Sequence, residues 1–332
     1  MMLPLIAVPM GDPAGIGPEI LVKALSEYNF TDICRILVIG SKSVLSQALS
    51  TCKTHLPIIN TDTLETVSNR KQINLHACAE YAVETRVGNV SALGGQAAYD
   101  CIENSVKLAL TKRVDAIATT PINKLSLKAA GINHIGHTEI LAALSGSASP
   151  LTLFQVHNLR VFFLSRHLSL RKACDFVTAD NVYGCATRIY EAMSSLGLRD
   201  PHLAIAALNP HGGEQALFGD EEDREVLPAI SKLKAEGYKV TGPVPADAVF
   251  HQALNGKFDA VLSLYHDQGH IATKMVDFER TVSITCGLPF LRTSVDHGTA
   301  FDIAGTGKAS AVSMIEAILT AAKYAASFQQ KK

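Results

Sequence analysis

Three histidines of this 332-residue chain each follow a short apolar run of strand length. His167 follows residues 161–164, His211 follows residues 203–208, and His266 follows residues 259–264. Imidazole binds zinc and neighbouring divalent metals, and three protein ligands with an open fourth position are typical of a catalytic metal site. Such a metal lowers the pKa of a bound alcohol and stabilises the alkoxide that expels hydride. Because no spacing rule links ligands so far apart, the signal is moderate, and a lone histidine at a strand end is more often structural. Only their equivalent positions favour a metal site.

Two cations, Lys274 and Arg292, follow His266 closely in the sequence. Arginine offers a bidentate fork to phosphate or carboxylate, and lysine offers a point charge. The residues around Arg292, 287–294, include Gly287 and Pro289 and indicate a shaped loop instead of a regular element. The alternative for either cation is a solvated surface position. Together they favour an anionic ligand.

Two glycine-rich segments are candidates for nucleotide binding. Residues 10–19, MGDPAGIGPE, follow an apolar run and open a helical pattern, with Pro18 suited to the first helical turn. This segment lacks the G-x-G-x-x-G spacing, so a Rossmann-type cofactor site is disfavoured. Residues 296–308 combine glycines with His297 and Asp302. A carboxylate there can accept ribose hydroxyls and disfavour a 2′-phosphate, which favours NAD. The alternative is a loop rich in turn residues.

The elements that must position these residues are short apolar strands that alternate with amphipathic helices. Strand-like runs span 5–9, 36–39, 116–119, 161–164, 203–207 and 260–264, and helical patterns span 95–110 and about 310–326. This alternation predicts parallel sheets covered on both faces, with ligands beyond the carboxyl ends of the strands. The last helix is expected to pack on the N-terminal half and make the first domain discontinuous.

Composition excludes several classes of protein. The formal net charge is −1 and the pI is about 6.9, so no basic surface indicates nucleic acid or an anionic membrane. The N-terminal apolar run has strand length and no basic residues before it, so we expect it to be neither a signal peptide nor a membrane span. Seven scattered cysteines without a C-x-x-C pair indicate reduced thiols in a cytoplasmic protein.

A set of long motifs, spread in order from residue 10 to residue 309, resembles one known family. They are MGDPAGIGPE at 10–19, TTPINK at 119–124, GHTE at 136–139, NPHGGE at 209–214, GDEE at 219–222, YHDQG at 265–269 and GLPFLRTSVDHGTAFDIAGTGKA at 287–309. Together they resemble the 4-hydroxythreonine-4-phosphate dehydrogenases.

The resemblance implies an α/β fold with two α/β/α domains and a cleft between them, like isocitrate and isopropylmalate dehydrogenases. We expect residues 1–130 with 300–332 to form one domain. Residues 131–299 would form the other, carrying the interface of a homodimer with a shared active site. The DHGTAFDIAG run is also similar to the cofactor segment of isopropylmalate dehydrogenases, which supports His297 and Asp302 as NAD-binding residues.

Site roles carry over by matching motif. His167, His211 and His266 match divalent-metal ligands drawn from both subunits. Zinc is the expected ion, and magnesium, cobalt and manganese are the alternatives. The matching substrate-binding residues are His137, Thr138, Lys274, Ser283 and Arg292. The candidates for proton transfer, whose individual roles stay open, are Asp247, Asp267 and Lys274.

Two departures from the family pattern concern the substrate. Ser283 stands where the family has a substrate-binding Asn, and His270 stands where an apolar residue is usual. The expected reaction is oxidation of the C3 hydroxyl of 4-phosphohydroxy-L-threonine to a 3-keto acid that decarboxylates, a step of pyridoxal 5′-phosphate synthesis. The alternative substrates are 4-phospho-D-threonate and 4-phospho-D-erythronate from sugar-acid catabolism. A phosphotransacetylase-like acyltransferase and a non-catalytic metabolite-binding protein are rival interpretations, and the intact histidine set disfavours both.

Overall fold

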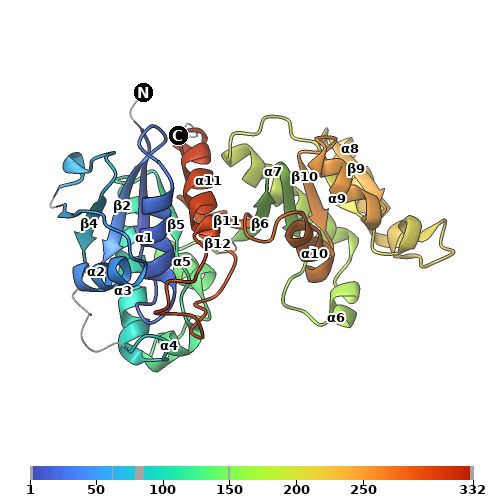
Figure 1. The fold of residues 1–332 in the computed structure, drawn as a ribbon. Coiled ribbons are helices and arrows are strands. Elements are labelled where there is room, and N and C mark those ends of the chain that lie inside the picture. The colour runs from blue at the N-terminus through green and yellow to red at the C-terminus, as the bar shows by residue number, and fades with distance from the viewer. Residues whose placement is uncertain (1–2, 62, 79–85, 149, 330–332) are drawn as a thin grey trace. The chain divides into compact units, whose positions relative to one another are not determined.

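The computed structural model describes residues 3–61, 63–78, 86–148 and 150–329 (Figure 1). The chain divides into two compact units: unit 1 contains residues 1–150 and 287–332, and unit 2 contains residues 151–286. These divisions differ from the expected boundaries after residues 130 and 299. Two elements account for the difference, because helix α5 (His137–Ser145) packs against α3 (Ala92–Leu110) and strand β12 (Leu291–Val295) pairs with β5 (Ala116–Thr119).

The sheet of unit 1 is parallel at every described pairing and has the strand order β3-β4-β2-β1-β5-β12. The remaining strands are β1 (Leu5–Pro9), β2 (Arg35–Gly40), β3 (Ile58–Asn60) and β4 (Ile73–Ala77). The strands β1, β5 and β12 are buried along their whole length, which explains the near-continuous apolar sequences of β1 and β5. The runs predicted at 5–9 and 116–119 coincide with β1 and β5.

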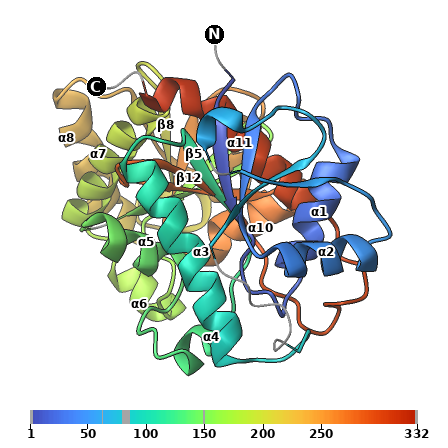
Figure 2. The ribbon, with the colours of Figure 1, turned by 90° about the vertical axis from the view of Figure 1, so that its left-hand side faces the viewer.

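Helices cover this sheet (Figures 1 and 2). Helix α3 packs against β1, β2 and β5, while α11 packs against β12, β5 and β1, as the apolar side of the final helix predicted. The other helices of unit 1 are α1 (Gly17–Glu27), α2 (Lys42–Thr51), α4 (Lys124–Ala129) and α11 (Val312–Gln329), with a short 3₁₀ turn at Leu64–Thr66. Side chains cap the N-termini of α3 and α4. At α3, Ser91 Oγ accepts a hydrogen bond from the N–H of Gly94 at 3.0 Å, and at α4, Asn123 Oδ1 accepts one from the N–H of Leu125 at 2.9 Å.

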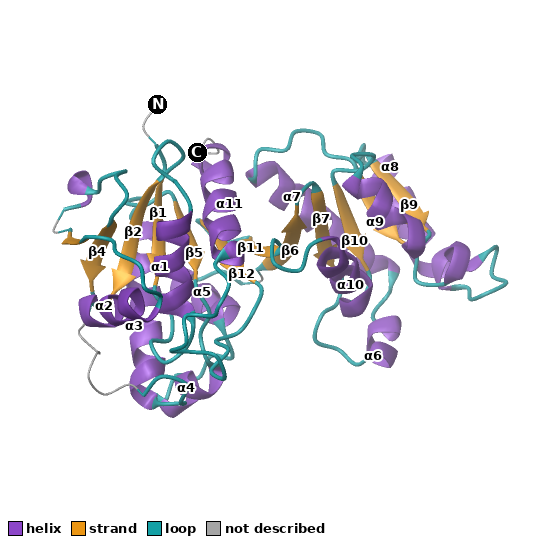
Figure 3. Ribbon diagram, in the orientation of Figure 1, coloured by secondary structure: helices purple, strands orange, loops and turns teal. Residues whose placement is uncertain are grey.

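The sheet of unit 2 has the order β11-β6-β7-β10-β8-β9 (Figure 3). The strands are β6 (Leu151–Val156), β7 (Leu159–Phe163), β8 (Leu203–Ala206), β9 (Val240–Val244), β10 (Ala260–Ser263) and β11 (Val282–Cys286). β7, β10, β8 and β9 run parallel, but β6 is antiparallel to β7 and to β11. The expectation of purely parallel sheets is therefore wrong here, because β6 and β7 form a hairpin closed by His157 and Asn158, with His157 at a φ of 51°.

Helices also pack on the strands of unit 2. They are α7 (Ala179–Ser195), α8 (Leu227–Ala235), α9 (Ala246–Leu254) and α10 (His266–Val276). Unit 2 also contains the short helix α6 (Leu170–Asp175). α9 and α10 pack against β7 and β10, and their core includes Phe163, Phe250 and Val261, all nearly buried. In the described part of the chain, no helix is both long and apolar enough to cross a lipid bilayer.

Candidate active site

The three candidate metal-binding histidines lie at one edge of the unit 2 sheet. They follow β7, β8 and β10, which are parallel neighbours, so their carboxyl ends meet at the same edge. The side chain of Gln268 links the carboxyl ends of β10 and β8 by hydrogen bonds. Its Oε1 accepts the N–H of Leu264 at 2.8 Å, and its Nε2 donates to the carbonyl of Ala207 at 2.7 Å.

His266 has the surroundings of a metal ligand. Its Nδ1 lies 2.8 Å from Oδ1 of Asp267, which leaves Nε2 available for a metal. A carboxylate that holds the other ring nitrogen is the usual partner of a metal-binding histidine. His266 also stacks on His270, with the ring centroids 4.1 Å apart. Burial lowers the pKa of His270 to about 4, and the charges of His266 and Lys274 act in the same direction. The ring of His270 that stacks on His266 is therefore uncharged at neutral pH.

The candidate metal ligands do not form a cluster among the described residues of this chain. His167 and His211 are exposed, and among the residues that the structure describes no group of three His, Cys, Asp or Glu side chains is close enough to hold a metal ion. The imidazole donors and the Asp267 partner fit a divalent metal in their chemistry.

His211 lies on a loop with an unusual backbone, just after the short turn η2 begins at Pro210. Every residue from 211 to 216 has a positive φ, with values from 45° to 82°, and four of the six are not glycine. Each non-glycine residue in this left-handed region costs roughly 1–2 kcal/mol. Such a loop persists only where its surroundings hold it.

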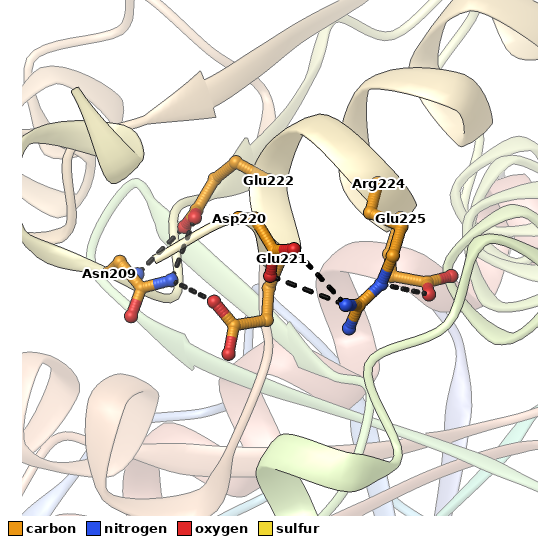
Figure 4. A network of polar contacts seen from close by, with 6 residues as sticks. All are labelled: Asn209, Asp220, Glu221, Glu222, Arg224 and Glu225. Carbon is orange, nitrogen blue, oxygen red and sulfur yellow. Dashed lines mark hydrogen bonds and ion pairs between the residues drawn. The ribbon is translucent and has the colours of Figure 1, made fainter. Parts of the chain in front are cut away.

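A buried carboxylate holds this loop (Figure 4). Glu222 is 1% exposed, and its Oε1 accepts the backbone N–H groups of Leu208 and Asn209, both at 2.7 Å. Its Oε2 accepts the side-chain Nδ2 of Asn209 at 2.9 Å. The exposed neighbours Asp220 and Arg224 pair with each other at 3.2 Å at the outer side of this network. Glu222 was not predicted as a site residue, because its local sequence is a run of charges without periodicity.

In unit 1, the structure brings His137 close to Arg292. Arg292 is 5% exposed and donates from Nε and Nη2 to Oγ1 of Thr119, at 3.1 and 2.6 Å. Burial lowers the pKa of Arg292 to about 9, so the guanidinium stays charged at neutral pH. Burial, and next the charge of Arg292, hold the pKa of His137 well below its usual value. The buried Nε2 of His137 has no hydrogen-bond partner among the described residues, which suits it to bind a ligand.

The expectation of a loop around Arg292 is wrong, because this residue lies on the buried strand β12. Arg292 pairs in register with Ile117 of β5. The glycine and proline at 287 and 289 precede the strand and obscured its start in the sequence. Thr138, the next candidate after His137, lies in the first turn of α5 and is half-buried.

The other candidates for substrate binding and proton transfer lie in unit 2. Asp247, in the first turn of α9, and Asp267, in the first turn of α10, line the same cavity of about 500 Å³. Lys274 is half-buried on α10, with Nζ 5.0 Å from the ring centroid of Phe278. Ser283 is 8% exposed on β11, opposite Phe154. The expected phosphate-binding cations, Lys274 and Arg292, thus belong to different units.

The two glycine-rich segments pack together in unit 1. The N–H of Ile16 donates to the carbonyl of Thr299 at 3.0 Å. The carboxylate of Glu19, 4% exposed, accepts the N–H groups of Gly305 and Gly307 at 2.5 and 2.7 Å. The two candidate nucleotide-binding segments, 10–19 and 296–308, therefore pack against each other in unit 1.

The expected NAD-binding side chains lie on this loop. His297 is half-buried, with Nδ1 3.0 Å from the carbonyl of Gly298, and Asp302 is exposed. An exposed carboxylate can accept the ribose hydroxyls of a dinucleotide. The amides of Gly305 and Gly307 already donate to Glu19, so these two groups are not open to a cofactor.

Comparisons with known proteins agree on one family. The family model described as "Pyridoxal phosphate biosynthetic protein PdxA" matches residues 32–321. A relative from Clostridium botulinum, provisionally named D-threonate 4-phosphate dehydrogenase, is 52% identical over 332 residues and 98% of both chains. A relative of the same name from Fusobacterium nucleatum is 54% identical, covering 98% of this chain and 99% of the other.

A solved structure supports the same assignment. The crystal structure of 4-hydroxythreonine-4-phosphate dehydrogenase from Klebsiella pneumoniae is 40% identical, covers 98% of both chains and has a TM-score of 0.90. The relatives and this neighbour are dehydrogenases, which makes the chain an enzyme of that class. The chain belongs to the PdxA family of 4-hydroxythreonine-4-phosphate dehydrogenases.

Proposed function

We propose that the enzyme oxidises the C3 hydroxyl of a small 4-phosphorylated hydroxy acid with NAD and a divalent metal, zinc being the first choice. The observation that carries this proposal is the placement of His167, His211 and His266 beyond three adjacent parallel strands. The bound metal would lower the pKa of the reacting hydroxyl, and NAD would accept the hydride. The product is a 3-keto acid, which can then lose its carboxylate as carbon dioxide.

The chain's own side chains bind and orient the substrate. In unit 1, the buried, charged Arg292 and the neutral His137 beside it favour the phosphate. Lys274 in unit 2 remains a second candidate cation for the phosphate. Asp267 orients His266 through its contact of 2.8 Å. Asp247 and Asp267 line one cavity, so a carboxylate from either can take the hydroxyl proton there, with Lys274 as the alternative.

Two substrates are candidates, and they differ at C2. The sequence placed 4-phosphohydroxy-L-threonine first, with a 2-amino group, and the name of the Klebsiella neighbour supports it. The names of the relatives with 52% and 54% identity support 4-phospho-D-threonate, which has a 2-hydroxyl. Ser283 offers one hydroxyl where the family has an amide, a change that fits an altered C2 substituent. We therefore favour the phosphothreonate.

The test is the initial rate of NADH formation by metal-loaded enzyme with each substrate side by side. We expect the higher kcat/KM with 4-phospho-D-threonate and loss of activity when a chelator removes the metal. The Ser283→Asn variant should shift the preference toward the amino substrate. Turnover of neither substrate would refute the proposed function. Preference for the amino substrate would place the enzyme in pyridoxal 5′-phosphate synthesis.

We further propose a homodimer that completes the metal site. In unit 2, exposed apolar side chains occur on three segments: the one after β7, the one after β8, and α10 with the residues that follow it. The same three segments carry His167, His211 and His266. The exposed apolar side chains are those of Leu168, Leu170, Phe176, Leu217, Phe218, Ile271, Met275 and Phe278. Exposed apolar surface of this kind is typical of a protein interface.

The interface can be tested by charge. Met275 is 80% exposed on α10, and Met275→Asp should convert a dimer to monomers in sedimentation velocity and abolish metal-dependent turnover. Ile59→Asp is the matched control, because Ile59 is 47% exposed in unit 1, outside these segments. A wild-type chain that sediments as a monomer while fully active would contradict the shared site.

A further inference from the structure

The GDEE motif at 219–222 has no place in the expected chemistry, yet its last residue is buried below the loop of His211. Glu222 is the first residue of η3 (Glu222–Val226) and has 1% of its surface exposed. Its two carboxylate oxygens accept three hydrogen bonds, two from the backbone of Leu208 and Asn209 and one from the Asn209 side chain. All of these donors lie just before His211 in the chain, and Figure 4 shows Glu222 beside Asn209.

The same carboxylate limits what the loop can contain. A Cβ atom added at Gly213, where φ is +82°, would lie 2.9 Å from Oε2 of Glu222 and 2.9 Å from the carbonyl oxygen of Gly219. A Cβ atom added at the neighbouring Gly212, where φ is +71°, would be 3.9 Å from its nearest atom, the carbonyl oxygen of Pro243. The carboxylate therefore limits the space at Gly213, whereas a Cβ atom at Gly212 would make only ordinary van der Waals contact.

We propose that Glu222 is a positioning residue that holds the left-handed loop so that His211 can bind the catalytic metal. This proposal rests on the proposed function. The role is assigned to positioning because both carboxylate oxygens of Glu222 accept hydrogen bonds from residues 208 and 209. Without the carboxylate, those N–H groups lose their partner, and the run of positive φ angles from 211 to 216 relaxes toward ordinary backbone. The imidazole then leaves the place where the other ligands need it.

The test is metal affinity, measured on the full-length chain by calorimetric titration with Zn²⁺ or Co²⁺ in the absence of substrate and NAD. The Glu222→Ala variant should bind metal at least about 10-fold more weakly, the lower end of losses seen when such supporting partners are removed. Glu222→Gln should lose less, because its amide oxygen can still accept the two backbone N–H groups. The visible spectrum of bound Co²⁺ should change in the same variants, which a purely structural role would not cause.

The matched control is Glu19→Gln in unit 1. Glu19 is also buried and also accepts two backbone N–H groups, but it holds the loop of Gly305 and Gly307. Its variant should bind metal within about twofold of the wild type. If Glu222→Ala binds metal as tightly as the wild type, the positioning role is wrong while the proposed function stands. A wild-type chain that binds no divalent metal would overturn both.

A second pair of variants keeps the proposal testable if the Glu222 variants fail to fold. Gly213→Ala and Gly212→Ala both place a side chain at a positive φ next to His211, but only the first meets the Glu222 carboxylate. Gly213→Ala should therefore weaken metal binding clearly more than Gly212→Ala. Equal losses in the two variants would show that backbone strain alone matters, and they would overturn the role of Glu222.

Discussion

Replacement of Arg292 by methionine separates the stability of the enzyme from its recognition of phosphate. Methionine keeps an unbranched side chain and removes the charge. Arg292 is 5% exposed, and burial lowers its pKa to about 9 without discharging it at pH 7. Transferring a charged side chain from water into the protein interior costs several kcal/mol, and this cost lowers the free energy of unfolding of the wild type. Thr119, which accepts from Arg292, keeps Ser294 Oγ as a partner at 3.0 Å after the change.

The expected effects have opposite signs. A buried ion replaced by an apolar side chain of similar size is often neutral or stabilising by about 1–4 kcal/mol, so the free energy of unfolding should stay constant or rise. A hydrogen bond to a charged group contributes about 1.5–3 kcal/mol, which corresponds to a rise in KM of about 10- to 150-fold. A residue that costs stability and supplies binding is expected at a functional site.

Urea unfolding followed by circular dichroism measures the first effect, and initial rates of NADH formation measure the second. D-threonate without its phosphate is the internal control, because its low kcat/KM should be the same in the wild type and in Arg292→Met. Arg292→Lys should fall between the two, since it keeps the charge and loses the fork. A variant with an unchanged KM and a lower urea midpoint would refute the reasoning and make Arg292 a structural residue.

Three further predictions concern other groups. The folded chain holds the pKa of His137 well below 6.5, so below pH 6.5 the unfolded chain binds a proton at this residue and the folded chain does not. The free energy of unfolding should therefore fall from pH 7.5 to pH 5. In urea unfolding, the midpoint of His137→Asn should fall less than that of the wild type over this range. An equal drop would contradict this account. Asp267→Asn should weaken Zn²⁺ binding about 10- to 100-fold in calorimetry through the freed ring of His266, and unchanged affinity would dismiss the contact at 2.8 Å. A thiol reagent should label the folded protein slowly at the four buried cysteines, as mass spectrometry can show; rapid labelling there would contradict their burial. These are Cys34, Cys101, Cys185 and Cys286.

The fold could be predicted wherever a strand is a continuous apolar run. The limits of β1 and β5 agree with the sequence because every residue of these strands is buried, so nothing polar interrupts the pattern. Strand β12 was missed for the opposite reason. Its polar residues Arg292 and Thr293 can be buried because acceptors far along the chain take their hydrogen bonds. Arg292 donates to Thr119 on β5, and Thr293 donates to the carbonyl of Ala317 on α11. No local pattern contains such partners.

The candidate site divides in the same way. The histidines could be placed because the carboxyl ends of parallel strands meet at one edge, a rule that needs only the strands. The neighbourhood of His137 and Arg292 could not be deduced, since it depends on α5 and β12 packing into one unit. Glu222 lies within a run of charges that resembles a solvated loop. Its burial follows from donors at Leu208 and Asn209, which only the folded backbone brings near.

The two buried glutamates also bear on how the enzyme must bind phosphate. Loops with glycine often bind anions through free backbone N–H groups. Here Glu19 accepts the N–H groups of Gly305 and Gly307, and Glu222 accepts those of Leu208 and Asn209. A carboxylate at these amides also repels a second anion. These four amides are therefore not open to a phosphate, and a charged arginine kept inside a β-sheet at a cost in stability is a group that can bind one instead.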